Sequence, residues 1–211
     1  MADTEPRVIT LGITGASGAM LAQTALRLLE AEPRVARIHL VVTEAGQRLL
    51  TEELSIVPRE PKQLPELLLG KAPSKTELLP NKDIGASIAS GSASVDSMLV
   101  LPCSAGTLAS IANGTSEDLL CRAADVCLKE GRTLVLCLRE TPLNRVHIEN
   151  MLRAQQAGVV IMPVVPAFYH QPKTLDDVIT QYVCRVLARI GLFQQEQYRW
   201  RGSAAARNAR A

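Results

Sequence analysis

Short runs of aliphatic and β-branched residues alternate along the chain with segments whose apolar residues recur every three or four positions. The apolar runs predict β-strands at residues 7–13, 37–42, 97–102, 133–138 and 159–165. The periodic segments predict helices at 19–31, 44–54, from about 104, 118–130, 145–157 and 174–190. Strands that are apolar throughout and separated by helices are typical of a parallel sheet covered on both faces. We therefore expect an α/β fold, a doubly wound parallel sheet in three layers (αβα).

The last predicted helix carries the clearest amphipathic stripe. Its apolar residues follow the i, i+3, i+4, i+7 spacing that places side chains on one face of a helix. They are Leu175, Val178, Ile179, Tyr182, Val183, Val186, Leu187 and Ile190. We expect the whole stripe to face the core.

Two segments depart from this alternation. Residues 57–82 contain five prolines and several lysines, which predicts an excursion over the surface. The basic, low-complexity end of the chain, RGSAAARNARA, is expected to be disordered. We therefore expect one domain over residues 1–192 and a C-terminal extension over 193–211.

Composition narrows the range of partners and the compartment. The net charge of +2 and an aromatic content of 3% give no reason to expect nucleic acid or a membrane surface as a partner. The five cysteines form no C-x-x-C pair and most lie in apolar periodic segments, which favours buried thiols in a reducing compartment over disulfides or a zinc site. The N-terminus lacks the pattern of a signal peptide, and no apolar run approaches the roughly 20 residues of a membrane span. These features predict a cytoplasmic protein.

Small and hydroxyl-bearing residues follow several of the predicted strands. The first strand is followed by TGASG (14–18), and the strand at 97–102 is followed by CSAGT (103–107). Ligands of open parallel sheets bind outside the carboxyl ends of the strands, and a helix N-terminus favours an anion there. The first turn alone could be a tight turn that needs small residues, because its spacing is G-x-x-G-x-x-G rather than G-x-G-x-x-G. Two such turns on one sheet edge favour a phosphate-bearing mononucleotide.

Other strand ends and helices add cations. Arg139 and Glu140 follow the strand at 133–138, and Tyr169 and His170 follow the strand at 159–165. On helix 118–130, Arg122, Asp125 and Lys129 have the spacing of a solvated ion-pair ladder, which is the plainer explanation for them. Arg185 borders the apolar stripe of the last helix and could simply extend its charged end into solvent.

Taken together, these motifs make the sequence resemble the UbiX-type flavin prenyltransferases over residues 7 to 192. The resemblance rests on the order and spacing of TGASGA (14–19), ASGS (89–92), LPCSAGTL (101–108), RAADVCLKE (122–130), LVLCLRETPL (134–143), HIENM (147–151), PAFYHQP (166–172) and LDDV (175–178). It implies a flavodoxin- or Rossmann-like fold in a large homo-oligomer, usually a dodecamer, with active sites between subunits. It also implies the joining of a dimethylallyl group, from dimethylallyl monophosphate, to N5 and C6 of reduced FMN. The prenylated FMN would serve a UbiD-type decarboxylase, often in ubiquinone biosynthesis.

The resemblance also implies roles for individual residues. The FMN-binding residues would be Gly15, Ala16, Ser17, Thr43, Ser104, Ala105, Gly106, Thr107 and Arg139, with Thr43 standing where the family usually has serine. The residues that bind the allylic substrate would be Ser90, Gly91, Ser92, Arg122, Lys129, Tyr169 and Arg185, some of them from a neighbouring subunit. The catalytic residues would be Ser17, Glu53, Lys129 and Glu140, although the adjacent Glu52 is an alternative to Glu53. Trp200 resembles a C-terminal aromatic residue that can cover the pocket.

The expected chemistry agrees with these residue types. Departure of an allylic phosphate needs its charge stabilised, and no third carboxylate follows Asp176 and Asp177 to form an aspartate-rich metal motif. Fixed cations, Lys129, Arg139 and Arg185, would take the place of a metal. Glu140, Glu53 or the released phosphate would take part in the proton transfers, and we expect Arg139 to favour ionisation of Glu140.

Three other functions share the fold or the flavin turns. A flavin-dependent cysteine decarboxylase would need a helix histidine and a mobile cysteine near the C-terminus, whereas Cys184 lies within a regular helical pattern. An electron shuttle of flavodoxin type would bind FMN without the cations around a second pocket. A flavin-storing or scaffolding subunit would bind FMN without transferring a prenyl group.

Overall fold

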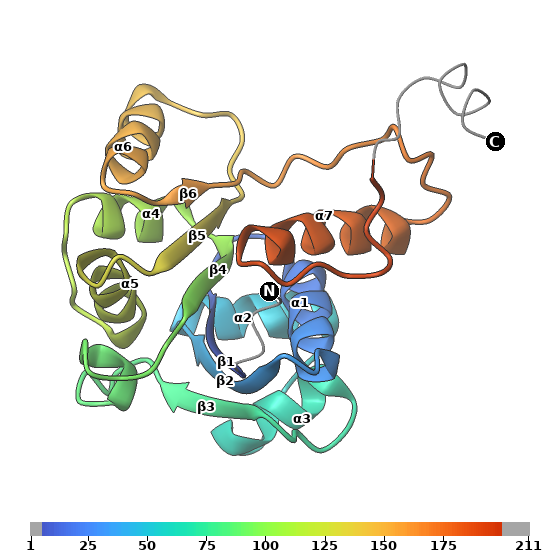
Figure 1. The fold of residues 1–211 in the computed structure, drawn as a ribbon, viewed down its shortest axis with the longest axis horizontal. Helices are drawn as coiled ribbons and strands as arrows, with labels where there is room; N and C mark the ends of the chain where they lie inside the picture. Colours follow the sequence, from blue (N-terminus) through green and yellow to red (C-terminus); the bar gives the residue numbers. More distant parts are fainter. Residues whose placement is uncertain (1–5, 200–211) are drawn as a thin grey trace.

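The computed structural model describes residues 6–199, which form one parallel β-sheet between two layers of helices (Figure 1). The strands are β1 (Arg7–Ile13), β2 (Val35–Val42), β3 (Thr76–Pro80), β4 (Ser97–Cys103), β5 (Thr133–Leu138) and β6 (Val160–Ile161). Their order in the sheet is β3-β2-β1-β4-β5-β6, and every neighbouring pair is parallel. The chain thus winds outward twice from β1, which confirms the predicted doubly wound sheet. The switch point lies between β1 and β4, where such sheets bind ligands.

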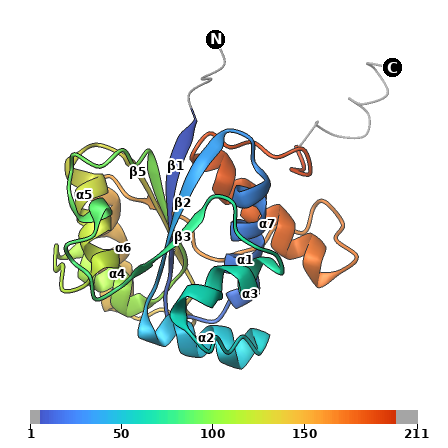
Figure 2. The ribbon, with the colours of Figure 1, turned by 90° about the horizontal axis from the view of Figure 1, so that it is seen from below.

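The helices divide between the two faces of the sheet (Figure 2). On one side lie α1 (Ala19–Ala31), α2 (Glu44–Leu54), α3 (Leu64–Leu69) and α7 (Leu175–Arg189). On the other lie α4 (Ala105–Ala112), α5 (Leu119–Lys129) and α6 (Arg145–Gln156). The predicted helices begin within a residue or two of these bounds, and those with a predicted end finish equally close to theirs, but α3 was not predicted.

Two hydrophobic cores, one on each face, explain why the strands are apolar throughout. Leu99 and Leu101 of β4 belong to the core beneath α1 and α7, whereas Met98 and Val100 belong to the core beneath α4 and α5. Successive strand residues point to opposite faces, so a strand buried on both sides needs an apolar residue at every position.

The stripe on α7 is buried over most of its length. Ile179, Tyr182, Val183, Val186, Leu187 and Ile190 are buried, but Leu175 is 64% exposed, so the prediction for Leu175 is wrong. The whole first turn of α7 is exposed, because Leu175, Asp176 and Asp177 all have exposed side chains and burial of the stripe begins at Ile179.

The proline-rich segment 57–82 is not a simple surface excursion. It contains a 3₁₀ turn (Pro61–Gln63), α3 and the edge strand β3. Pro80 is accommodated because it ends a strand at the sheet edge, where a missing N–H costs no ladder bond. Short, half-exposed elements of this kind carry little periodic signal, and this accounts for the error.

β6 is shorter than the predicted 159–165. Even so, the amides of Met162 and Val164 donate to the carbonyl oxygens of Leu136 and Leu138, so the chain still follows β5 beyond Ile161. Pro163 lies between these two donors, so its missing amide faces the open edge of the sheet and removes no bond to β5. This irregular stretch carries the chain to the carboxyl edge of the sheet, where it forms one wall of a pocket.

No helix between residues 6 and 199 is long and apolar enough to cross a lipid bilayer. All five cysteines are unpaired and buried, as the apolar pattern around them predicts. Burial raises the pKa of the Cys121 and Cys137 thiols to about 12 and of the Cys127 and Cys184 thiols to about 11.

Candidate active site

The turn between β1 and α1 depends on two glycines. A Cβ atom on Gly15 would lie 2.4 Å from the Cβ of Ala45, so only glycine lets this turn pack against the first turn of α2. Gly18 has a φ of 130°, a backbone conformation that residues with a side chain rarely adopt. Gly15 and Ser17 are exposed at the carboxyl edge of the sheet, whereas Ala16 is buried. The backbone of the turn is therefore close enough to the surface to contact a ligand.

The turn between β4 and α4 presents a helix N-terminus. Ser104 caps α4: its hydroxyl accepts from the amide of Thr107 at 3.2 Å and donates to the Thr107 hydroxyl at 3.0 Å. The amides of Ala105 and Gly106 lie in the first helical turn, where no carbonyl of the same helix can pair with them. Such a helix end favours an anion.

Thr14 joins the two turns. Its hydroxyl donates to the carbonyl oxygen of Pro102 at 2.9 Å and accepts from the amide of Ser104 at 2.8 Å. The side chain is buried, with only 1% of its surface exposed. No role for Thr14 was predicted, although a hydroxyl at the end of an apolar strand was a usable signal.

Glu53 of α2 caps the N-terminus of α1, where Gly18 has no side chain to do so. Its carboxylate accepts from the amides of Gly18 at 3.0 Å and Ala19 at 2.7 Å, and from the Ser17 side chain. Partial burial acts to raise the pKa of Glu53, but these hydrogen bonds and the charge of Arg139 together hold it below its ordinary value. The neighbouring Glu52 instead forms an exposed ion pair with Arg48 at 3.5 Å. Of the two adjacent glutamates, Glu53 is therefore the one that contacts the first turn.

Thr43 lies at the carboxyl end of β2 and caps α2. Its hydroxyl accepts from the amide of Gly46 at 3.0 Å and lies 3.5 Å from the carbonyl oxygen of Ile13. The side chain is half-buried beside the first turn, at the edge where a flavin contact was predicted.

Arg139 and Glu140 follow β5 at the same edge of the sheet. The amide of Arg139 donates to the carbonyl oxygen of Cys103, beside the second turn. The Nε atom of Arg139 is buried and has no partner among the described residues. Glu140 accepts from the amide of Thr141 at 3.0 Å. The positive charge of Arg139 helps to lower the pKa of Glu53. A buried guanidinium nitrogen without a partner, next to two glycine-containing turns, fits a ligand that carries hydrogen-bond acceptors.

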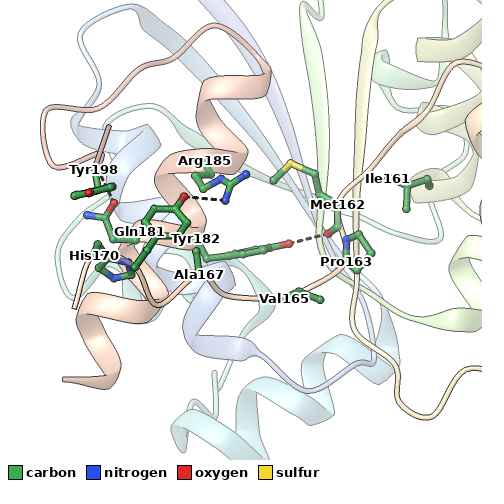
Figure 3. Close-up of a pocket in the computed structure, with 11 residues that line it drawn as sticks. Ile161, Met162, Pro163, Val165, Ala167, His170, Gln181, Tyr182, Arg185 and Tyr198 are labelled. Atoms are coloured by element: carbon green, nitrogen blue, oxygen red, sulfur yellow. Dashed lines mark hydrogen bonds between the residues drawn. The ribbon is translucent and has the colours of Figure 1, made fainter. Parts of the chain in front are cut away.

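A pocket of about 230 Å³ opens between the 161–170 segment and α7 (Figure 3). Ile161, Met162, Pro163 and Val165 form one end, and Gln181, His170 and Tyr198 lie at the other. An Nη of Arg185 donates to the hydroxyl of Tyr169 at 3.4 Å, and both residues line the pocket. The pocket thus has an apolar end, a polar end and the Arg185 guanidinium between them, which suits a small amphiphilic anion (Figure 3).

The remaining predicted residues gather elsewhere in the protomer. Arg132, directly before β5, donates to the carbonyl oxygen of Gly91 at 2.7 Å, and Lys129 pairs with Glu130 beside it. Lys129 thus precedes β5 whereas Arg139 follows it, and a strand of six residues spans about 20 Å. Lys129 and the Ser90–Ser92 loop therefore lie toward the amino edge of the sheet, away from the turns in the same chain.

The ion-pair ladder predicted on α5 is half present. Arg122 pairs with Asp125 at 2.6 Å and also donates to the carbonyl oxygen of Ala89 at 3.2 Å. Lys129 does not complete the ladder, because its ammonium pairs with Glu130. Arg122 thus holds the segment before the Ser90–Ser92 loop against α5.

The described residues contain no group of three or more histidine, cysteine or acidic side chains that could hold a metal ion. Asp177 is engaged in capping α7, where it accepts from the amides of Lys173 and Thr174 at 2.9 Å. Trp200 lies outside the described residues. Gln181 and Tyr198 line the pocket but were missed, because nothing in the sequence indicates that the segment after α7 folds back.

The chain has relatives of known family over most of its length. The family model described as Flavoprotein matches residues 2–184. Flavin prenyltransferase UbiX of Halalkalibacterium halodurans is 44% identical over 194 residues, which cover 92% of this chain and 93% of that protein. Flavin prenyltransferase UbiX of Escherichia coli K12 is 42% identical over 92% of this chain and 98% of that protein.

Solved structures are similar over nearly the whole chain. AnUbiX (PadA1), in complex with FMN and dimethylallyl pyrophosphate, has a TM-score of 0.84 and 38% identity, covering 94% of this chain and all of that one. A dodecameric FMN-dependent UbiX-like decarboxylase from Escherichia coli O157:H7 has a TM-score of 0.81 and 39% identity, covering 92% and 100% of the two chains. The FMN-dependent cysteine decarboxylase TvaF, at 14% identity and a TM-score of 0.56, shares the fold alone.

Proposed function

The chain belongs to the UbiX flavin prenyltransferases, within the Flavoprotein family, and on that premise we propose the reaction that it catalyses and the residues that carry it. The enzyme joins the dimethylallyl group of dimethylallyl monophosphate to N5 and C6 of reduced FMN, without a metal ion. FMN is a substrate here, and the product is prenylated FMN. The observation that carries the proposal is the pairing of two phosphate-type turns with a separate amphiphilic pocket at one edge of the sheet.

The two turns and Arg139 would hold FMN. The amides of Gly15, Ala16 and Ser17 in the first turn, and those of Ala105, Gly106 and Thr107 in the second, suit a phosphate or the polar edge of a flavin. Because the Thr14 hydroxyl ties the turns together, their spacing is set before FMN arrives. Thr43 and Ser104 would complete the contacts. The buried Nε of Arg139 is the strongest support, since FMN would supply the acceptor that it lacks.

The pocket between the 161–170 segment and α7 would take the allylic phosphate. Its apolar end suits the five-carbon chain, while Tyr169 and Arg185 suit the phosphate. A guanidinium can donate two parallel hydrogen bonds to phosphate oxygens, so Arg185 would both orient the substrate and stabilise the charge of the departing phosphate.

Glu53 and Glu140 would handle protons at the flavin. The capping bonds hold the Glu53 carboxylate ionised next to Ser17, so it can accept a proton or orient the Ser17 hydroxyl. Glu140 follows Arg139 directly and would serve beside it. The released phosphate is a further acceptor for the proton lost at C6.

Lys129, Arg122 and the Ser90–Ser92 loop would act in the site of a neighbouring subunit. In a single protomer Lys129 precedes the strand that Arg139 follows, so Lys129 cannot serve its own turns. The exposed apolar side chains on and before α6, Leu143, Val146, Ile148 and Leu152, favour a subunit contact. We propose a homo-oligomer, a dodecamer like the one solved for the Escherichia coli O157:H7 relative.

The product would be delivered to a UbiD-type decarboxylase, with ubiquinone biosynthesis as one route. Five unpaired buried cysteines support work in a reducing compartment such as the cytoplasm.

A mass measurement tests the proposed reaction. The protein is loaded with FMN, reduced without oxygen and mixed with dimethylallyl monophosphate or, separately, with the diphosphate. A flavin mass gain of one five-carbon unit with the monophosphate supports the proposal, and parallel reactions with and without EDTA test metal independence. A reduced flavin that keeps its mass with both donors would instead indicate an electron shuttle or a flavin-storing subunit.

A further inference from the structure

The segment that follows α7 is anchored at its start to the connection between α1 and β2. Arg34 donates to the carbonyl oxygen of Phe193 at 3.1 Å, and the side-chain amide of Gln194 donates to Glu32 at 2.9 Å. Hydrogen bonding to Arg34 lowers the pKa of Glu32 to about 2, so this carboxylate stays charged under all ordinary conditions. The anchor turns the chain back along α7.

Gln181 holds the other end of this segment. Its side-chain nitrogen donates to the carbonyl oxygen of Glu196 at 2.5 Å, and its side-chain oxygen accepts from the amide of Tyr198 at 2.7 Å. One amide thus pairs with two backbone groups two residues apart. This reciprocal arrangement fixes the register of the segment on α7, and few side chains other than glutamine or asparagine can both donate and accept in this way.

The register decides where the Tyr198 ring lies. The ring centroid of Tyr198 is 5.4 Å from that of Tyr169 and 6.2 Å from that of His170. Tyr169 in turn accepts from Arg185. Contacts therefore run from Gln181 through Tyr198 and Tyr169 to the guanidinium. Gln181, Tyr198, Tyr169 and Arg185 all line the same pocket.

We propose that Gln181 is a positioning residue for the allylic phosphate. By clamping the backbone of residues 196–198, it packs Tyr198 against Tyr169 and so fixes the Tyr169–Arg185 pair that binds the phosphate. This proposal rests on the proposed function, which puts the allylic phosphate in this pocket. Gln181 does not contact the flavin turns, so its effect belongs to the second substrate alone.

Kinetics of Gln181→Met test the proposal, because methionine keeps the length of the side chain but makes neither hydrogen bond. With two net hydrogen bonds lost, we expect the KM for dimethylallyl monophosphate to rise roughly tenfold, with kcat within about twofold and FMN affinity unchanged. Gln181→Glu keeps the acceptor for the Tyr198 amide, so its KM should lie between those of the wild type and Gln181→Met. Gln195→Met, at an exposed position of the same segment, is the matched control and should behave as the wild type.

A double-mutant cycle separates positioning from general destabilisation. Because Gln181 acts through Tyr198, Gln181→Met should add little to the KM of Tyr198→Ala. Cleavage by trypsin after Arg199 should be faster in Gln181→Met than in Gln195→Met, which reports the release of the segment directly.

The positioning role is overturned if Gln181→Met leaves the KM unchanged, even if the wild type makes prenylated FMN. It is also overturned if the effects of Gln181→Met and Tyr198→Ala on the KM are fully additive. A wild type that binds FMN but yields no product overturns the proposed function first, and the two failures are therefore distinguishable.

Discussion

The Thr14 hydroxyl accepts a hydrogen bond of 2.8 Å from the amide of Ser104, 90 residues further along the chain. The same hydroxyl donates to the carbonyl oxygen of Pro102, so one buried side chain sets the distance between the two turns. A preset distance matters for a ligand held by both turns, because no binding energy is then spent on ordering them.

Thr14→Val should therefore weaken both the fold and FMN binding. Valine keeps the shape but leaves the Ser104 amide and Pro102 carbonyl without this partner, which costs about 1–3 kcal/mol. We expect the free energy of unfolding of the apo-protein in urea to fall by that amount and FMN affinity to fall roughly tenfold.

Thr10→Val on the same strand is the control for that substitution. The Thr10 hydroxyl is fully buried and has no partner in the described chain, so replacing it with a methyl group should leave stability unchanged or increase it. If Thr14→Val and Thr10→Val lost equal amounts of unfolding free energy and FMN affinity, the Thr14 bridge would have no special role.

Gly15→Ala should displace the first turn from α2. The added Cβ would meet the Cβ of Ala45 at 2.4 Å, so one of the two segments must move. We expect FMN affinity, measured by fluorescence titration, to fall at least tenfold. Gly15→Ala combined with Ala45→Gly removes the contact and should restore most of the affinity; failure of this rescue would point to a direct clash with FMN.

Glu53→Gln should lower the rate of prenyl transfer by about 100-fold if the carboxylate takes part in proton transfer. Glu52→Gln is the matched control, because Glu52 is exposed and pairs only with Arg48 in the described chain. Single-turnover measurements with pre-reduced FMN would separate this step from product release. If Glu52→Gln lost activity and Glu53→Gln did not, the proton-transfer role would belong to Glu52 instead.

The same carboxylate predicts a pH dependence of stability. Its pKa is lowered in the folded protein, so its contribution to stability is fully present above the ordinary carboxyl value of 4.5 and is lost as the pH falls through the lowered native value. The difference in unfolding free energy between wild type and Glu53→Gln should therefore narrow below pH 4.5. Urea titrations at several pH values would measure this difference. If it did not change with pH, the proposed link between Glu53 ionisation and stability would be contradicted.

Mixed oligomers test whether sites are shared between subunits. Lys129→Met and Glu53→Gln should each be nearly inactive alone. If Glu53 and Lys129 of one site come from different chains, random reassembly of equal amounts should restore about a quarter of wild-type activity. Mixing without reassembly is the control, and no recovery after reassembly would place both residues in one subunit.

The sheet was predictable because burial on both faces leaves an unmistakable apolar signal in β1, β2, β4 and β5. β3 was not, because an edge strand with half-exposed residues and a terminal proline carries little of that pattern. The exposure of Leu175 was missed for a related reason: periodicity identifies an apolar face but not how far its neighbour extends.

The site divides in the same way. Local motifs identified the turns at Gly15 and Ser104, since each sits on consecutive residues between a strand and a helix. The contacts of Glu53 with Gly18 and of Gln181 with Tyr198 join separate segments, and only the folded chain reveals them. The effect of Arg139 on Glu140 stays a prediction, whereas its effect in lowering the pKa of Glu53, a residue of a separate segment, could not be predicted from the sequence.

In the proposed reaction the protein binds reduced FMN, and the burial of all five thiols then has a consequence. Reduced flavins react with dioxygen and release hydrogen peroxide, and the peroxide attacks cysteine chiefly as the thiolate. With thiol pKa values of about 11 to 12 at four positions and a still stronger elevation at Cys103, almost none is ionised at neutral pH. We therefore expect these cysteines to resist oxidation to sulfenic acid by the peroxide that bound reduced FMN would generate.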